Sequence, residues 1–173
     1  MDKIYLDHNA TTPIAPEVLH IVTSVLRDQV GNPSSVHSMG RSARVLLDEA
    51  REQVASLIGA SPSEIVFTSG GTEANNLALL GVALGIGKTG GHIVTSQVEH
   101  PSVLNPCRQL ESMGFVVDRL RVDELGRIDL QSLENCLTES TLLISLQHAN
   151  SETGVLQDIE KIGEIARKKG VLF

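Results

Sequence analysis

The chain has 173 residues, of which 41% are hydrophobic and 20% charged, which is the composition of a globular protein with a sizeable core. Its formal net charge of -7 argues against a broad basic surface for nucleic acid or for an anionic membrane. Only 2% of the residues are aromatic, which also argues against base-stacking platforms.

The first third of the chain is predicted to be helical. The expected elements are a helix at 16–30, a turn-rich loop GNPSSVH at 31–37, a helix at 42–58 and a turn at 61–64. Both helices have apolar residues at helical spacing. Pro16 suits a first helical turn, and Gly31 and Gly59 follow the last residues of the two helices, where glycine is common.

Strands and helices alternate from residue 65 onward. The predicted strands are 65–68, 92–96, 115–121, 141–146 and, at the end, 171–173. The predicted helices are 72–84, 101–113, 130–137 and 159–169. Alternation with short connections is typical of a mostly parallel sheet covered by helices, so the predicted fold class is α/β.

The last predicted strand begins at Val171, and the sequence stops at Phe173. A central parallel strand buries apolar side chains and needs a neighbour on each side. A short edge strand is one interpretation of this ending. The interpretation that we favour is a chain that belongs to something longer or that pairs with a second polypeptide.

The stretch FTSGGTEANN at 67–76 places two glycines between a predicted strand and a predicted helix. Helix N-termini present unpaired backbone N–H groups, and glycine lets an anion approach them. Gly71 and the hydroxyl of Thr72 are therefore candidates for holding a phosphate. A glycine-rich turn in which Thr72 simply caps the helix fits this stretch about equally well.

The stretch GIGKTG at 85–90 resembles a Walker phosphate loop but lacks its first glycine, because position 82 is Val82. The predicted helix also precedes the stretch and does not follow it. We interpret it as a solvated turn.

Two further polar segments follow predicted strands. His100 comes after the strand at 92–96, and Asn150 lies in QHANSETG after the strand at 141–146. The carboxyl ends of parallel strands meet at one edge of the sheet, where open α/β sheets bind ligands. A flat cofactor ring or a proton transfer would suit His100. The alternatives are an ordinary surface histidine and an Asx-type turn ending at Gly154.

Other kinds of site find little support in the sequence. It has no HxxxH and no CxxC spacing, so no metal site is expected, and no GxSxG nucleophile elbow. Cys107 and Cys136 are interpreted as structural, and two cysteines fit a reducing cytoplasm. The N-terminus lacks the apolar core of a signal peptide, and no run approaches the roughly 20 apolar residues of a membrane span.

Five motifs occur along the chain in this order: YLDHNATTP, GNPSSVH, TSGGTEANN, EHPSVL and HANSETG. Together they closely resemble cysteine desulfurases, in the class V aminotransferase group of pyridoxal-phosphate (PLP) enzymes. The resemblance covers essentially all of the chain. It implies the N-terminal part of a PLP-binding large domain, with 1–31 as an N-terminal segment and the small domain absent.

The resemblance also implies an activity and partners. The family takes sulfur from L-cysteine, leaves L-alanine, and passes the sulfur to an acceptor protein for iron–sulfur cluster assembly or thiolation. It is homodimeric. Gly71 and Thr72 would hold the PLP phosphate, His100 would stack on the ring and take part in proton transfer, and Asn150 would approach the ring's phenolic oxygen and the substrate. The substrate side would be completed by Ala10, Thr11 and Asn32.

The chain departs from the family pattern in two ways. Ser151 stands where the family usually has Asn. More importantly, the family's Schiff-base Lys, its ring-pairing Asp and its nucleophilic Cys come later than VLF and are not in this sequence. We therefore expect no desulfurase activity from this chain alone, which would be either a fragment of a longer chain or a subunit that a C-terminal polypeptide completes. The alternatives are a non-catalytic remnant or dimerisation module, and a related PLP lyase such as a selenocysteine lyase.

Overall fold

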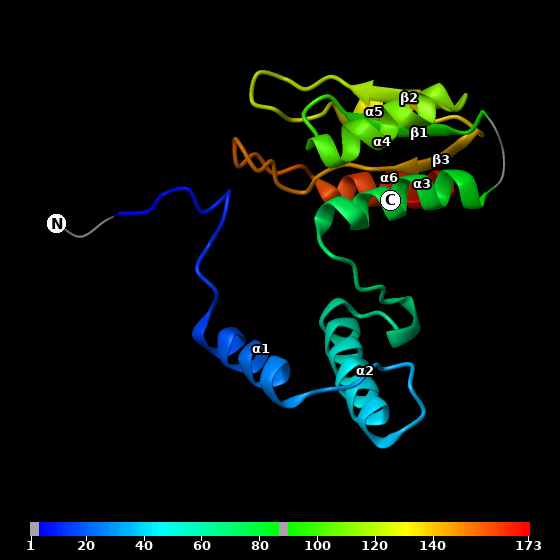
Figure 1. The fold of residues 1–173 in the computed structure, drawn as a ribbon. Coiled ribbons are helices and arrows are strands. Elements are labelled where there is room, and N and C mark those ends of the chain that lie inside the picture. The colour runs from blue at the N-terminus through cyan, green and yellow to red at the C-terminus, as the bar shows by residue number, and fades with distance from the viewer. Residues whose placement is uncertain (1–3, 87–89) are drawn as a thin grey trace. The chain divides into compact units, whose positions relative to one another are not determined.

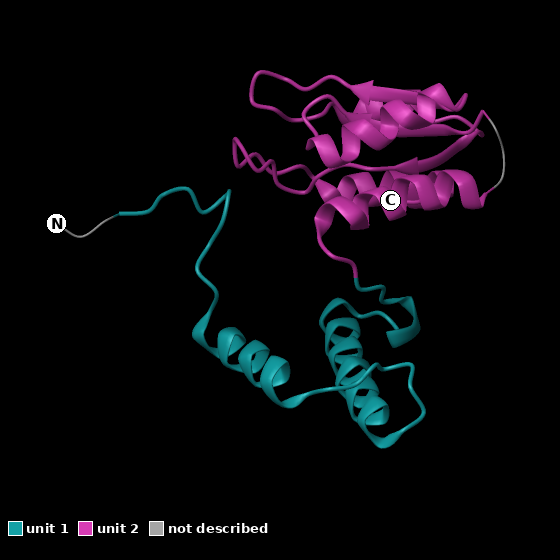
Figure 2. Ribbon diagram, viewed as in Figure 1, with its two compact units in different colours: residues 1–67 teal, residues 68–173 magenta. Residues whose placement is uncertain are grey.

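The structure is a computed structural model that describes residues 4–86 and 90–173. The chain forms two compact units, residues 1–67 and 68–173 (Figure 2). The Walker-like stretch at 85–90 includes residues 87–89, so its interpretation as a turn lies outside the described residues.

The first unit contains helices α1 (Pro16–Asp28) and α2 (Ser38–Ile58) and a 3₁₀ turn, η1 (Pro62–Glu64). The helix at 42–58 was predicted to begin too late, because α2 starts at Ser38. His37 caps it, with its Nδ1 accepting a hydrogen bond from the amide of Gly40 at 3.3 Å. Histidine is not among the usual N-cap residues, so no start signal was visible at this position. The helix ends as predicted at Gly59, which is left-handed with φ 67°.

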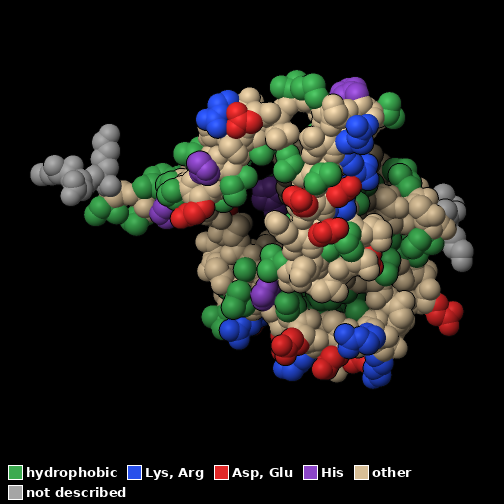
Figure 3. Space-filling model, turned by 90° about the horizontal axis from the view of Figure 1, so that it is seen from below, with side chains coloured by type: hydrophobic (Ala, Val, Ile, Leu, Met, Phe, Trp, Pro, Cys, Tyr) green, Lys and Arg blue, Asp and Glu red, His purple; other side chains and the backbone are tan. Residues whose placement is uncertain are grey.

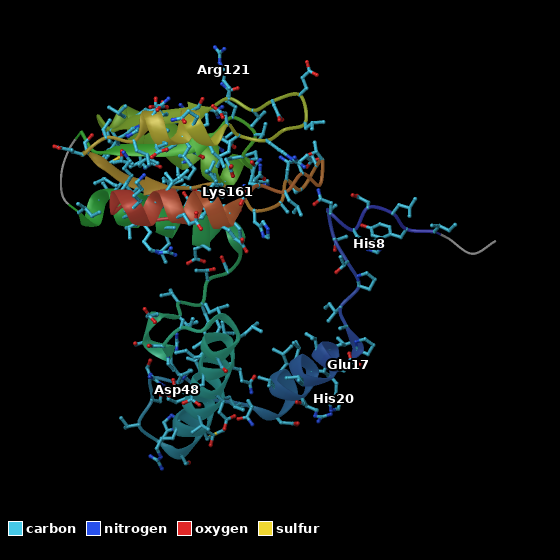
Figure 4. The ribbon with its side chains drawn as sticks, turned by 180° about the vertical axis from the view of Figure 1, so that it is seen from behind. His8, Glu17, His20, Asp48, Arg121 and Lys161 are labelled. Atoms are coloured by element: carbon cyan, nitrogen blue, oxygen red, sulfur yellow. The ribbon has the colours of Figure 1, made fainter. Side chains whose placement is uncertain are left out.

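The second unit alternates helices and strands and confirms the predicted α/β class (Figure 1). Its elements are α3 (Gly71–Gly85), β1 (His92–Ser96), α4 (Pro101–Ser112), β2 (Val116–Leu120), α5 (Leu130–Cys136), β3 (Thr141–Ile144) and α6 (Ile159–Lys169). The predicted bounds differ from these by two residues or fewer. Helix α6 is capped by Asp158, which accepts from the amide of Lys161 at 3.2 Å and pairs with its ammonium at 2.7 Å. Lys161 is labelled on α6 in Figure 4.

The three strands are parallel and lie in the order β2-β1-β3. Beyond β3, Leu172 forms an isolated parallel bridge with Leu143, and its carbonyl accepts a hydrogen bond from the amide of Ile144 at 2.8 Å. The predicted strand at 171–173 therefore begins to pair beside β3. Strand β1 is buried along its whole length because both of its neighbours are strands and both of its faces are covered.

Two apolar clusters pack on opposite faces of the sheet. Neighbouring residues of β1 point to opposite sides, so Ile93 belongs to one cluster and Val94 to the other. On the first face, Leu79 of α3 and Leu110 of α4 pack against the sheet. On the second face, α5 and α6 do so, for example through Leu133. The unit therefore has three layers, with α3 and α4 on one side and α5 and α6 on the other.

The predicted strand at 65–68 is wrong. These residues form no ladder with any described strand. Instead, the segment is held by α2: a guanidinium nitrogen of Arg51 donates to the carbonyl of Ile65, and the same group lies 5.0 Å from the ring centroid of Phe67. An apolar, β-branched run has the composition of a strand, but it becomes one only where another strand supplies hydrogen-bond partners.

Candidate functional site

Helix α3 begins at the two glycines that the sequence singled out. Gly70 is the N-cap and makes no side-chain cap bond, and the helix starts at Gly71. Its first amides have no acceptor within the helix. A Cβ at either glycine would meet nothing within 4 Å, so the bare backbone is open to a ligand. Thr72 lies inside the helix, which shows that the capping alternative for Thr72 is wrong.

A carboxylate closes the turn before this helix. Glu73 Oε2 accepts hydrogen bonds from the amide of Ser69 at 2.7 Å and from its hydroxyl at 2.6 Å. These bonds, that of the hydroxyl first, lower the pKa of Glu73. The sequence analysis did not single out this pair, although an acid in the first turn of a helix was a usable signal. The contact ties Ser69, just before the two glycines, to the first turn of α3.

His100 sits at the N-terminus of α4. Its Nδ1 accepts a hydrogen bond from the amide of Ser102 at 3.1 Å and lies 2.8 Å from the hydroxyl oxygen of Ser102. That hydroxyl in turn accepts from the side-chain amide of Asn75 on α3, at 2.8 Å. The sequence analysis missed both Asn75 and Ser102, since residues 27 positions apart meet only through the packing of α3 on α4.

Thr72 and His100 meet in one cavity. The cavity has a volume of about 380 Å³ and is formed by the first two turns of α3 and by α4 with its N-cap residue. Its lining residues are Thr72, Asn76, His100, Pro101, Ser102, Asn105, Pro106 and Gln109. A candidate phosphate ligand and a candidate ring or proton partner, which are far apart in the sequence, therefore line the same pocket. Within the described residues the hydroxyl of Thr72 makes no hydrogen bond.

A buried carboxylate joins the loop after β1 to the loop after β3. Glu99 is 7% exposed, and it accepts from the hydroxyl of Ser96 at 2.7 Å and from the amide of Gln147 at 3.2 Å. Burial raises the pKa of Glu99, while the bonds from Ser96 and Gln147 act in the opposite direction. The side chain of Gln147 also donates to the carbonyl of Val98 at 2.7 Å. The segment that carries His100 is thus attached to the segment that carries Asn150.

Asn150 forms the Asx-type turn that was the alternative to a ligand contact. Its Oδ1 accepts from the amides of Glu152 and Thr153, both at 2.9 Å, and Gly154 follows with φ 73°. Its Nδ2 donates to the carbonyl of Val98 at 3.1 Å. Nδ2 carries a second hydrogen for which no partner exists among the described residues. Asn150 therefore has a clear structural role and keeps one free donor.

The remaining predicted site residues lie in the first unit, so the cavity just described does not include them. The amides of Ala10 and Thr11 bond to the carbonyl of Asp7, at 3.2 Å and 3.4 Å, in a turn. The Oδ1 of Asn32 accepts from the amide of Ser34 at 2.9 Å. All three residues are exposed.

The described residues hold neither a grouped set of metal ligands nor a helix that could span a membrane. Within residues 4–86 and 90–173, no three His, Cys, Asp or Glu side chains are grouped to hold a metal ion. In the same part of the chain, no helix has the length and apolar character to span a membrane.

The three parallel strands, covered by helices on both faces, define an α/β fold, with a pocket lined by α3 and α4. A family model described as aminotransferase class-V matches residues 4–173, and the chain belongs to this family.

The relatives of the chain carry more specific names. It is 46% identical over 171 residues to the cysteine desulfurase IscS of Dictyoglomus turgidum, covering 99% of this chain and 43% of that one. It is 50% identical over 173 residues to a protein of the same name from Pectobacterium carotovorum, covering 98% and 43%. A solved structure described as SspA in complex with cysteine is similar with a TM-score of 0.91 and 41% identity, covering 96% and 48%. The chain spans less than half the length of these relatives.

Proposed function

We propose that the chain is the N-terminal part of the PLP-binding large domain of a cysteine desulfurase, with residues 1–31 as an N-terminal segment. The observation that carries the proposal is the cavity shared by Thr72 and His100, in a chain 46% identical to a protein of that name. The complete protein would take sulfur from L-cysteine, leave L-alanine and pass the sulfur to an acceptor protein. The relative in complex with cysteine supports this substrate.

The residues present fit PLP by their chemistry. The open glycine backbone at the start of α3 and the hydroxyl of Thr72 are donors suited to a phosphate. The imidazole of His100 suits a flat pyridine ring, and the free Nδ2 hydrogen of Asn150 suits a phenolic oxygen. PLP, when bound, supplies an electron sink for bond cleavage in an amino acid.

In this proposal each of the chain's site residues has its own role. Gly71 and Thr72 bind the phosphate and fix the position of the ring. His100 covers one face of the ring and holds a proton at Nε2, because Nδ1 is occupied by Ser102. Asn150 orients the ring and the substrate, and Ala10, Thr11 and Asn32 line the substrate side.

The site needs groups that these residues do not supply. The Schiff-base Lys, the ring-pairing Asp and the nucleophilic Cys of the family are not among the motifs of these 173 residues. We infer that they come either from the rest of a longer chain or from a complementing C-terminal polypeptide, that the complete protein is a cytoplasmic homodimer, and that it serves iron–sulfur cluster assembly or thiolation. The chain alone is then inactive as a desulfurase.

The proposal is tested by PLP binding and by product formation. We expect the chain to bind PLP, followed by its visible absorbance, and expect Thr72→Val to weaken binding about tenfold because one hydrogen bond to a charged phosphate is lost. Thr23→Val on α1, whose hydroxyl bonds to the carbonyl of Leu19, is the matched control. Alanine should form from cysteine only with the completing polypeptide.

Two results would contradict the proposal. Sustained alanine production by the pure chain would show that the missing groups are not needed. If neither the chain nor the complete protein bound PLP, the proposed PLP-dependent function would be wrong.

A further inference from the structure

A polar network stands behind His100, and the proposed function assigns no role to the hydroxyl of Ser102 or to Asn75 within it. The hydroxyl of Ser102 contacts Nδ1 of His100 at 2.8 Å, and Asn75 contacts that hydroxyl at 2.8 Å from another helix. Ser102 is only 8% exposed. A simple helix cap needs only the amide of Ser102, which is already bonded to Nδ1 at 3.1 Å. The hydroxyl and Asn75 therefore serve more than capping.

The donors in this network fix the direction of each hydrogen bond. A backbone amide can only donate, so Nδ1 of His100 must be an acceptor and carries no proton. The side-chain amide of Asn75 donates to the oxygen of Ser102, which leaves the Ser102 hydrogen free to point at Nδ1. In neutral His100 the proton must then be on Nε2, the nitrogen that has no partner among the described residues.

We propose that Asn75 and Ser102 are positioning residues that hold His100 as its Nε2–H tautomer, so that the neutral ring presents an N–H donor to a ligand in the cavity. The chemical class of that ligand is one with an acceptor atom or a developing negative charge next to the ring. This inference concerns the free chain, and only its meaning for catalysis rests on the proposed function.

The test is the tautomer itself. In the 173-residue chain labelled with ¹⁵N at histidine, the two ring nitrogens of His100 are observed by long-range ¹H–¹⁵N correlation at about pH 8, above the usual histidine pKa of about 6.5. His100→Gln assigns the signals among the six histidines. We expect a protonated Nε2 and an unprotonated, hydrogen-bonded Nδ1.

Substitutions separate positioning from capping. Ser102→Ala keeps the amide but removes the hydroxyl, so the ratio of the Nε2–H to the Nδ1–H tautomer should fall about 2- to 10-fold, the range of one ordinary hydrogen bond. Ser102→Thr should restore the ratio. Asn75→Ala should act in the same direction as Ser102→Ala. The matched control is Ser112→Ala on the same helix, because Ser112 does not line the cavity and its hydroxyl bonds to the carbonyl of Gln109 and not to His100, Ser102 or Asn75.

The tautomer measurements decide whether Asn75 and Ser102 position His100. A protonated Nδ1 or an even mixture in the unsubstituted chain overturns the proposal, and this measurement needs no variant to fold. An unchanged ratio in folded Ser102→Ala and Asn75→Ala variants reduces the network to a helix cap and also overturns it. If the tautomer is as expected but the chain binds no PLP, the positioning role stands and the proposed function fails.

Discussion

Glu99 is a carboxylate whose protonation is linked to folding. Burial raises its pKa in the folded chain, so the folded state holds the proton more tightly than the unfolded state does. The stability that this proton binding contributes is fully present below the unfolded pKa of about 4.3, and it is lost as the pH rises through the higher folded pKa.

Glu99→Gln removes this pH dependence. We expect the free energy of unfolding of the unsubstituted chain to fall, relative to the variant, as the pH is raised from about 4 toward neutral. Urea unfolding at a series of pH values measures the difference. A constant difference between the two proteins across the series would contradict the linkage.

Cys107 is a buried thiol and Cys136 a half-buried one. Cys107 is fully buried, and burial is the main cause that raises its pKa. A thiol reagent attacks the thiolate, so Cys107 should react only when the chain opens. We expect Cys136 to react first and Cys107 to react at the rate of unfolding, as measured by thiol labelling of Cys107→Ser and Cys136→Ser variants. Rapid labelling of native Cys136→Ser would show an exposed Cys107.

Helix ends were predicted well where the responsible residue acts locally. Gly59 is left-handed and follows α2, and Pro16 stands in the first turn of α1, whereas Gly31 does not end α1, which stops at Asp28. These are properties of one residue and its backbone. The start of α2 was missed because His37 caps through its side chain. The strand predicted at 65–68 was wrong because a strand forms only where a neighbouring strand supplies hydrogen-bond partners.

Substituting the glycine that follows α6 and a glycine inside α3 should change the free energy of unfolding in opposite directions. Gly170 has φ 68° and nothing near its Cβ position, so Gly170→Ala should lower the free energy of unfolding by about 1–2 kcal/mol through conformation alone. Gly81 lies inside α3 with only an ordinary contact at 3.9 Å, so Gly81→Ala should raise it by about 0.5–1 kcal/mol. Urea unfolding of both variants measures these two changes in the free energy of unfolding. Changes of the same sign would contradict the prediction.

At the scale of the whole molecule, the first unit leaves much apolar surface uncovered. In α1, whose residues 16–28 are all described, none is buried, and its large apolar side chains are 39% to 79% exposed. Hydrophobic side chains also reach the surface at many places in Figure 3. Apolar patches of this kind are typical of surfaces that another chain or segment covers.

The isolated chain should therefore bind a hydrophobic dye, and its completing polypeptide should reduce that binding. Leu26→Ala, at a side chain 79% exposed, should change the free energy of unfolding by less than about 0.5 kcal/mol. Leu133→Ala, at a fully buried side chain, should cost about 2–5 kcal/mol. Dye fluorescence and urea unfolding measure the two effects, and a large loss of stability in Leu26→Ala would mean that α1 is already covered.

The sequence by itself determined the α/β class, the order of the elements and the candidate positions Gly71, Thr72, His100 and Asn150, because periodicity, turn residues and motif order are local properties. Only the tertiary structure decided that Thr72 and His100 share one cavity. It also decided that Asn75 and Ser102 stand behind the imidazole and that Glu99 joins two loops. These contacts link residues up to 48 positions apart, which meet because parallel strands bring their carboxyl ends to one edge and α3 packs on α4.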